Sequence, residues 1–134
     1  MVYSLSRLET RPVTLKRFLS LWLPVVLWCG LIFALSNTEN LRITEGPLDF
    51  VLRKTAHLGE YFILVLFLWR ALAGSTDWPL SAIFSMTLAL AILYAASDEY
   101  HQTYIPGRVG CLHDVLIDSA GASIACFVRR FFGR

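Results

Sequence analysis

Four long apolar segments constrain the fold of this chain more than any other feature of its sequence. They cover residues 18–36, 56–73, 80–97 and 112–128 of a 134-residue chain. A helix needs about 20 mostly apolar residues to cross a hydrocarbon core of roughly 30 Å, and each segment approaches that length. With 56% hydrophobic residues and a mean hydropathy of +0.57, the chain is too apolar for an ordinary soluble domain. We therefore expect an all-α integral membrane protein with four transmembrane helices.

The polar segments between the expected spans indicate how the chain is divided and oriented. Residues 1–17 and 129–134 are interpreted as tails on either side of a four-helix membrane domain, 18–128, with residues 37–55 and 74–79 as loops. The first loop has room for one short interfacial helix. Short cytoplasmic segments of membrane proteins are enriched in Lys and Arg. If both tails are cytoplasmic, eight of these basic residues lie inside and four lie outside. This distribution predicts that both termini are cytoplasmic.

A polar stripe enters the membrane at the beginning of the second span. At 3.6 residues per turn, Lys54, His57 and Tyr61 share one face of a helix, and Glu60 lies close to that face. Polar side chains in a membrane span are costly unless they have partners. We expect this face to point toward other helices rather than toward lipid.

A second polar group surrounds the turn between the third and fourth spans. Asp98 closes the third apolar segment and shares a face with Gln102 if that helix continues for one more turn. Pro106 and Gly107 indicate a turn, which brings in Arg108. In the fourth span, Asp114, Asp118, Gly121 and Ala125 follow one another at intervals of four, three and four residues, as expected for one packed stripe.

The expected topology places both polar groups at the extracytoplasmic ends of their helices. Lys54 and Arg108 face four carboxylates there, those of Glu60, Asp98, Asp114 and Asp118, so two negative charges are in excess if His57 is neutral. Mutual pairing does not neutralise such a cluster. It requires protons on some carboxylates, a bound cation, or a cationic group of a ligand.

Other candidate features point to no further site. Arg53, Glu99 and His101 are interpreted as interfacial residues in or near the headgroup zone. The three cysteines have no metal-ligand spacing. No basic stripe is interleaved with stacking aromatic residues, so we expect no nucleic-acid partner.

These motifs, taken together and in order, resemble those of the VanZ-like family of small bacterial membrane proteins, named from an accessory protein of glycopeptide resistance operons. They are Lys54-x-x-His57-x-x-Glu60-Tyr61, Ser97-Asp98-Glu99-x-x-Gln102, Pro106-Gly107-Arg108 and Asp114-x-x-x-Asp118-x-x-Gly121. The resemblance covers about residues 18–128. It implies a multi-pass protein of a bacterial inner membrane, in a family sometimes linked to reduced susceptibility to teicoplanin-type glycopeptides. It implies no assigned reaction.

Three interpretations of the polar cluster remain open. In the favoured one, the cluster binds an anionic lipid or cell-wall-precursor headgroup, with Lys54 and Arg108 on the anion. The ligand-binding residues would then be Lys54, His57, Glu60, Tyr61, Asp98, Gln102, Arg108, Asp114 and Asp118.

The second interpretation is a membrane-embedded hydrolase or phosphoryl-transfer enzyme. Its candidate catalytic residues are His57, Asp98 and Asp114, and a divalent cation, its one expected cofactor, would be held by these three residues together with Asp118. The sequence has no HExxH motif. In the third interpretation the charges form a structural polar lock between helix ends and need no ligand. We expect a binding protein rather than an enzyme.

Overall fold

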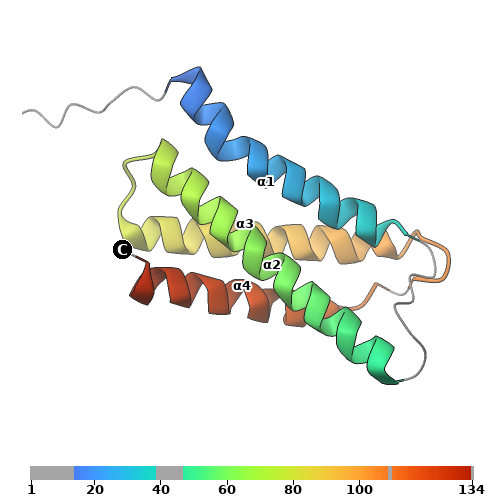
Figure 1. Cartoon of the computed structure of the whole chain (residues 1–134). Coiled ribbons are helices and arrows are strands. Elements are labelled where there is room, and N and C mark those ends of the chain that lie inside the picture. Colours follow the sequence, from blue (N-terminus) through green and yellow to red (C-terminus); the bar gives the residue numbers. More distant parts are fainter. Residues whose placement is uncertain (1–13, 39–46, 109, 134) are drawn as a thin grey trace, which may run out of the picture.

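The computed structural model describes residues 14–38, 47–108 and 110–133, and those residues form four helices and no strand. The helices are α1 (Leu15–Ser36), α2 (Pro47–Ser75), α3 (Leu80–Gln102) and α4 (Leu112–Phe132). They run up and down, so the start of α1 and the end of α4 lie at the same end of the bundle (Figure 1). The all-α prediction is confirmed.

Helix α2 is the centre of the bundle. It contacts each of the other three helices and packs most extensively on α4, while α1 lies on the opposite side of the bundle from α4 (Figure 1). Its buried side chains make up much of the apolar core: Tyr61, Leu64, Val65, Leu68, Trp69, Ala71 and Leu72. Helix α1 instead exposes large apolar side chains, including Leu19, Leu23 and Leu27, as expected for a helix in contact with lipid.

Hydrogen bonds across helices fix α1 against its neighbours. Trp28 Nε1 donates to the backbone oxygen of Glu60 over 2.9 Å, and the hydroxyl of Tyr94 donates to the backbone oxygen of Cys29 over 2.7 Å. In an apolar environment such bonds are favoured because the alternative is an unsatisfied polar group. They position the end of α1 beside α2 and α3.

The four-span prediction is confirmed for three helices and not for the fourth. Leu15–Ser36, Val51–Ser75 and Leu80–Gln102 are long and apolar enough to cross a membrane. Helix α4 does not reach that standard, because Asp114 and Asp118 near its start and Arg129 and Arg130 near its end leave too short an uncharged stretch. The orientation of the termini stays a prediction.

The second half of the predicted loop 37–55 is helical, but it is continuous with the second span and is not a separate short helix. Helix α2 begins at Pro47, whereas residues 39–46 lie outside the described residues. A proline at the first position of a helix loses no hydrogen bond, because the first amide groups have no partner in the helix. Close to this start, Arg53 Nε lies 2.8 Å from Asp49 Oδ2. The two residues are four positions apart, and their ion pair stabilises the first turns of α2.

The predicted tails are also partly helical. Residues 15–17 belong to α1 and residues 129–132 to α4, whereas residues 1–13 and 134 lie outside the described residues. The side chain of Thr14 caps α1 by accepting a hydrogen bond from the backbone N–H of Arg17 over 3.3 Å. Each outer helix therefore extends beyond its apolar segment.

Candidate functional site

The polar motifs meet at one end of the bundle, where α1 and α3 end and α2 and α4 begin (Figure 1). Because consecutive helices run in opposite directions, motifs at the start of α2 and α4 lie beside the motif at the end of α3. Residues 60 positions apart in the chain, such as Lys54 and Asp114, form a direct contact there. The structure thus brings the separate motifs together.

Two pairs of polar side chains join α2 to α4. Lys54 Nζ forms an ion pair with Asp114 Oδ1, and His57 Nδ1 lies 3.2 Å from Asp118 Oδ1. Lys54 and His57 are three residues apart and therefore project from the same face of α2. Asp118 is fully buried, and its Oδ2 has no hydrogen-bond partner. These pairs are the contacts that a polar lock requires.

A second cluster lies at the end of α3. This helix continues through Gln102, so Asp98 and Gln102 share one face, as predicted. Gln102 Nε2 donates to Asp98 Oδ2 over 3.1 Å and to Glu99 Oε1 over 3.4 Å. The backbone N–H of Cys111 donates to Glu99 Oε2 over 2.9 Å. Glu99 is only 3% exposed. The chain folds back and covers it, whereas its place in or near the headgroup zone stays a prediction.

Arg108 is positioned by a tight turn. Its backbone N–H donates to the oxygen of Ile105 over 3.0 Å, Pro106 occupies the second position and Gly107 has a φ of 78° at the third. That combination is a type II turn, in which glycine is favoured because the third residue has a positive φ. The turn directs the guanidinium back toward the end of α1.

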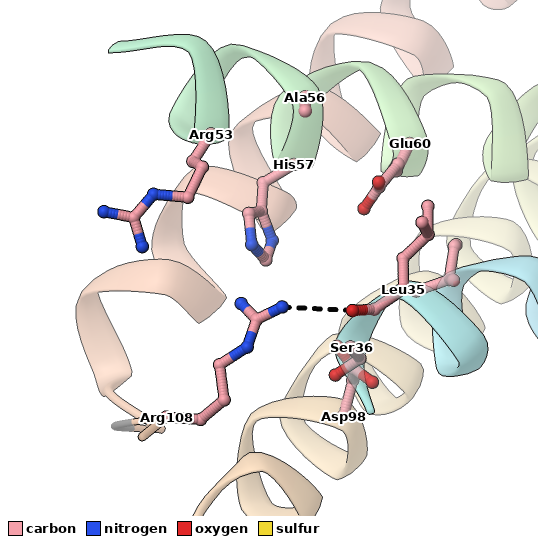
Figure 2. A pocket seen from close by; sticks show the side chains of 9 residues that line it. Leu35, Ser36, Arg53, Ala56, His57, Glu60, Asp98 and Arg108 are labelled. Carbon is pink, nitrogen blue, oxygen red and sulfur yellow. Dashed lines mark hydrogen bonds between the residues drawn. The ribbon is translucent and has the colours of Figure 1, made fainter. Parts of the chain in front are cut away.

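The guanidinium of Arg108 binds backbone rather than carboxylate oxygens. Nε donates to the oxygen of Thr38 over 3.1 Å, and Nη2 donates to the oxygen of Leu35 over 3.0 Å (Figure 2). A cation is favourable at the carboxyl end of a helix, where carbonyl groups are left without partners. Among the described residues, Arg108 has no carboxylate at ion-pair distance. Its guanidinium therefore makes no direct ion pair there, although Glu60 and Asp98 line the small cavity together with it.

Two cavities adjoin Arg108. The small cavity has a volume of about 50 Å³ and is lined by Ile32, Leu35, Ser36, Arg53, Ala56, His57, Glu60, Asp98 and Arg108 (Figure 2). The basic cavity has a volume of about 300 Å³ and is lined by Arg53, Lys54, His57, Gln102, Gly107, Arg108, Cys111 and Asp114. Arg53, His57 and Arg108 line both, so the two cavities share a wall.

Most predicted ligand-binding residues line one of these cavities, but two do not. Tyr61 is fully buried in the core, with its ring 6.3 Å from that of Tyr94, and Asp118 is enclosed beside His57. Two polar residues that were not among the predicted ligand-binding residues also line the small cavity. Ser36, at the end of α1, gave no motif of its own, and Arg53 was assigned to the interface. The one sequence feature that could have indicated Ser36 is its position at the end of the first span, on the side of the membrane where the polar motifs were expected.

The other histidines lie away from the cavities. The side chain of His113 is 69% exposed, and the ring of His101 packs 4.8 Å from that of Phe33. Neither lines the small cavity or the basic cavity. His57 is therefore the histidine of the site.

Two groups of side chains could hold a metal ion. The possible ligand atoms of His57, Glu99 and Asp118 lie within 4.8 Å of one another, and so do those of Glu99, Cys111 and Asp114. One nitrogen and two carboxylates suit several divalent metals. Asp98, a predicted metal ligand, belongs to neither group, whereas Glu99 belongs to both.

Comparison with known proteins identifies the family. Neither curated proteins nor solved structures provide a match to this chain. The family model for VanZ/LLP1 matches residues 10–133, nearly the whole chain, and the three helices long and apolar enough to cross a membrane fit a multi-pass membrane protein of this type. The chain belongs to the VanZ/LLP1 family.

Proposed function

We propose that this protein binds the anionic phosphate of a lipid or cell-wall-precursor headgroup in the basic cavity. The site would lie at the extracytoplasmic face of a bacterial inner membrane, and occupancy would influence susceptibility to teicoplanin-type glycopeptides. The single observation that carries this proposal is Arg108, which lines both cavities and is held by two backbone oxygens rather than by a carboxylate. Its charge is available to a ligand.

The charges around the basic cavity support a phosphate ligand. Arg53, Lys54 and Arg108 line it together with one acidic side chain, Asp114, so its lining carries an excess of positive charge. Arginine suits phosphate because its planar guanidinium offers several N–H donors in a fixed geometry. At about 300 Å³ the basic cavity is at the lower end of the size range of small-molecule sites. A headgroup fits such a space better than a whole lipid.

We expect Arg108→Gln to weaken binding of phosphatidylglycerol by roughly 10- to 100-fold, because hydrogen bonds to a charged group contribute roughly 1.5–3 kcal/mol. Native mass spectrometry of the detergent-purified full chain, titrated with the lipid, measures this loss. Cells producing the same variant should lose any effect of the wild type on teicoplanin susceptibility.

Arg70→Gln is the matched control. Arg70 also donates to a backbone oxygen, that of Ser20 over 3.3 Å, but it does so at the opposite end of the bundle. The Arg70→Gln variant should bind phosphatidylglycerol with the same affinity as the wild type. Equal phosphatidylglycerol affinity in folded Arg108→Gln and in wild type would refute the proposed function.

A metal-dependent reaction is the second candidate, favoured by the proximity of His57, Glu99 and Asp118. A divalent ion there would be held by buried side chains beside the basic cavity, where it could polarise a phosphoryl oxygen. If this is correct, protein purified without chelator retains about one metal ion per chain, and Glu99→Gln loses it. Metal analysis of both proteins tests this, and a metal-free wild type that binds no added Zn²⁺ or Mn²⁺ excludes the metal site.

A further inference from the structure

The small cavity contains buried polar atoms that have no partner. Ser36 is 6% exposed and Asp98 is 4% exposed, and both line this cavity. The hydroxyl oxygen of Ser36 and Oδ1 of Asp98 have no hydrogen-bond partner. A buried polar group without a partner is unfavourable, because it has lost its hydrogen bonds to water. Two such atoms in one cavity indicate that it takes an occupant with hydrogen-bond donors.

Glu60 adds a third acceptor to the same space. Figure 2 shows its carboxylate pointing from α2, and that of Asp98 pointing from α3, toward the end of α1 where Ser36 lies. The Glu60 carboxylate has no hydrogen bond or ion pair within the described part of the chain. The cavity therefore offers two carboxylates and one hydroxyl as acceptors.

These acceptors match a primary ammonium group. An ammonium carries three N–H donors and no acceptor, and its positive charge complements Glu60 and Asp98. The guanidinium groups of Arg53 and Arg108 line the same cavity, so the ammonium must lie on its carboxylate side. A volume of about 50 Å³ exceeds what one water needs, about 10–15 Å³ by the same kind of measure, but is far smaller than an ordinary ligand site. A compact group therefore fits it better than a bulky trimethylammonium, which also has no N–H to donate.

The position of the small cavity links this group to a phosphate. Arg53, His57 and Arg108 line both cavities, so an ammonium in the small cavity lies across one wall from an anion in the basic cavity. A linker that joins the two must pass between these shared side chains. Because both cavities lie at the helix ends of a membrane protein, where lipid headgroups are found, a lipid is the nearest source of such a molecule.

We propose that the headgroup recognised is phosphoethanolamine, as in phosphatidylethanolamine, with its phosphate on Arg108 in the basic cavity and its primary ammonium between Asp98, Glu60 and Ser36 in the small cavity. This rests on the proposed function, because it assigns the phosphate to the same arginine. It adds a selectivity that phosphate binding alone does not give.

The test compares three phospholipids with the same acyl chains. Native mass spectrometry of the full chain in detergent should show phosphatidylethanolamine bound about tenfold more tightly than phosphatidylglycerol, which lacks the amine, or phosphatidylcholine, whose amine is fully methylated. Tenfold corresponds to about 1.4 kcal/mol. Equal affinities for the three lipids in folded wild type would overturn this inference but leave the proposed function intact.

Asp98→Asn tests the residue itself. Its amide oxygen can still accept the hydrogen bond from Gln102, but its amide nitrogen would present a donor to the cavity in place of an acceptor. The ratio of phosphatidylethanolamine to phosphatidylglycerol affinity should fall about tenfold, and an unchanged ratio would overturn the assignment. Glu60→Gln serves if Asp98→Asn does not fold. If the folded wild type binds none of the three lipids, the proposed function itself is refuted, and not only the selectivity for phosphatidylethanolamine.

Discussion

Gly121→Ala is expected to destabilise the protein by about 1–3 kcal/mol or more, the range for overpacked interiors. A Cβ atom at this position of α4 would lie 2.3 Å from the backbone oxygen of Leu58 in α2. The obstacle is backbone, so no side-chain rotation relieves it, and the two helices would have to separate. Because α2 and α4 share the most extensive helix contact, the loss should be global. Denaturant titration in detergent, followed by tryptophan fluorescence, measures it.

Two other glycines provide the controls. A Cβ atom at Gly30 in α1 or at Gly59 in α2 meets nothing within 4 Å. Alanine is favoured over glycine inside a helix by roughly 0.5–1 kcal/mol, so Gly30→Ala and Gly59→Ala should leave the free energy of unfolding unchanged or raise it slightly. If Gly121→Ala behaves like these controls, the close contact between α2 and α4 is not as described.

His57→Leu is expected to lower the free energy of unfolding by about 3 kcal/mol, because it leaves the fully buried Asp118 without its partner. The double variant His57→Leu/Asp118→Leu should recover most of this loss, since apolar side chains of similar size replace buried ion pairs at little or no penalty. The difference between the double variant and the sum of the single ones measures the coupling.

The same double variant separates a structural from a functional role of the pair. Leu116→Ala, at a residue of α4 that is 61% exposed, is the control for an ordinary apolar change on that helix. A stable double variant that no longer binds phospholipid assigns His57 to the ligand site, whose cavities it lines. A double variant whose loss of stability equals the sum of the losses in His57→Leu and Asp118→Leu would show that the two side chains are not coupled.

The sequence predicted the helix boundaries well where turn residues or apolar segments mark them. Pro79 precedes α3, and the turn at Pro106 and Gly107 follows it, as predicted. The start of α2 was missed because charged residues there resemble a loop. In the structure Arg53 pairs with Asp49 and Lys54 pairs with Asp114 on another helix. A helix extension stabilised by charged pairs, one within α2 and one with α4, gives no apolar signal.

The residues of the candidate site likewise divide into those that the sequence predicts and those that it does not. Asp98, Arg108, His57 and Glu60 could be selected from sequence, because charged side chains next to apolar segments are conspicuous. Ser36 could not, because a serine at the end of an apolar helix is common. The burial of Glu99 was not predicted, because it depends on the chain turning back until the backbone N–H of Cys111 reaches the Glu99 carboxylate. Burial of this kind is a property of the assembled bundle.

The sequence by itself determined the helical class, the apolar nature of three spans and the end of the bundle at which the charges gather. Length, hydropathy and helical periodicity decide these, and all three are local properties of the chain. Only the tertiary structure decided which charges are paired and which are not. Asp114 and Asp118 are engaged by α2, whereas Arg108 binds backbone oxygens and Asp98 keeps one oxygen without a partner. Pairing depends on distances of a few ångströms between helices, and no local pattern encodes those distances.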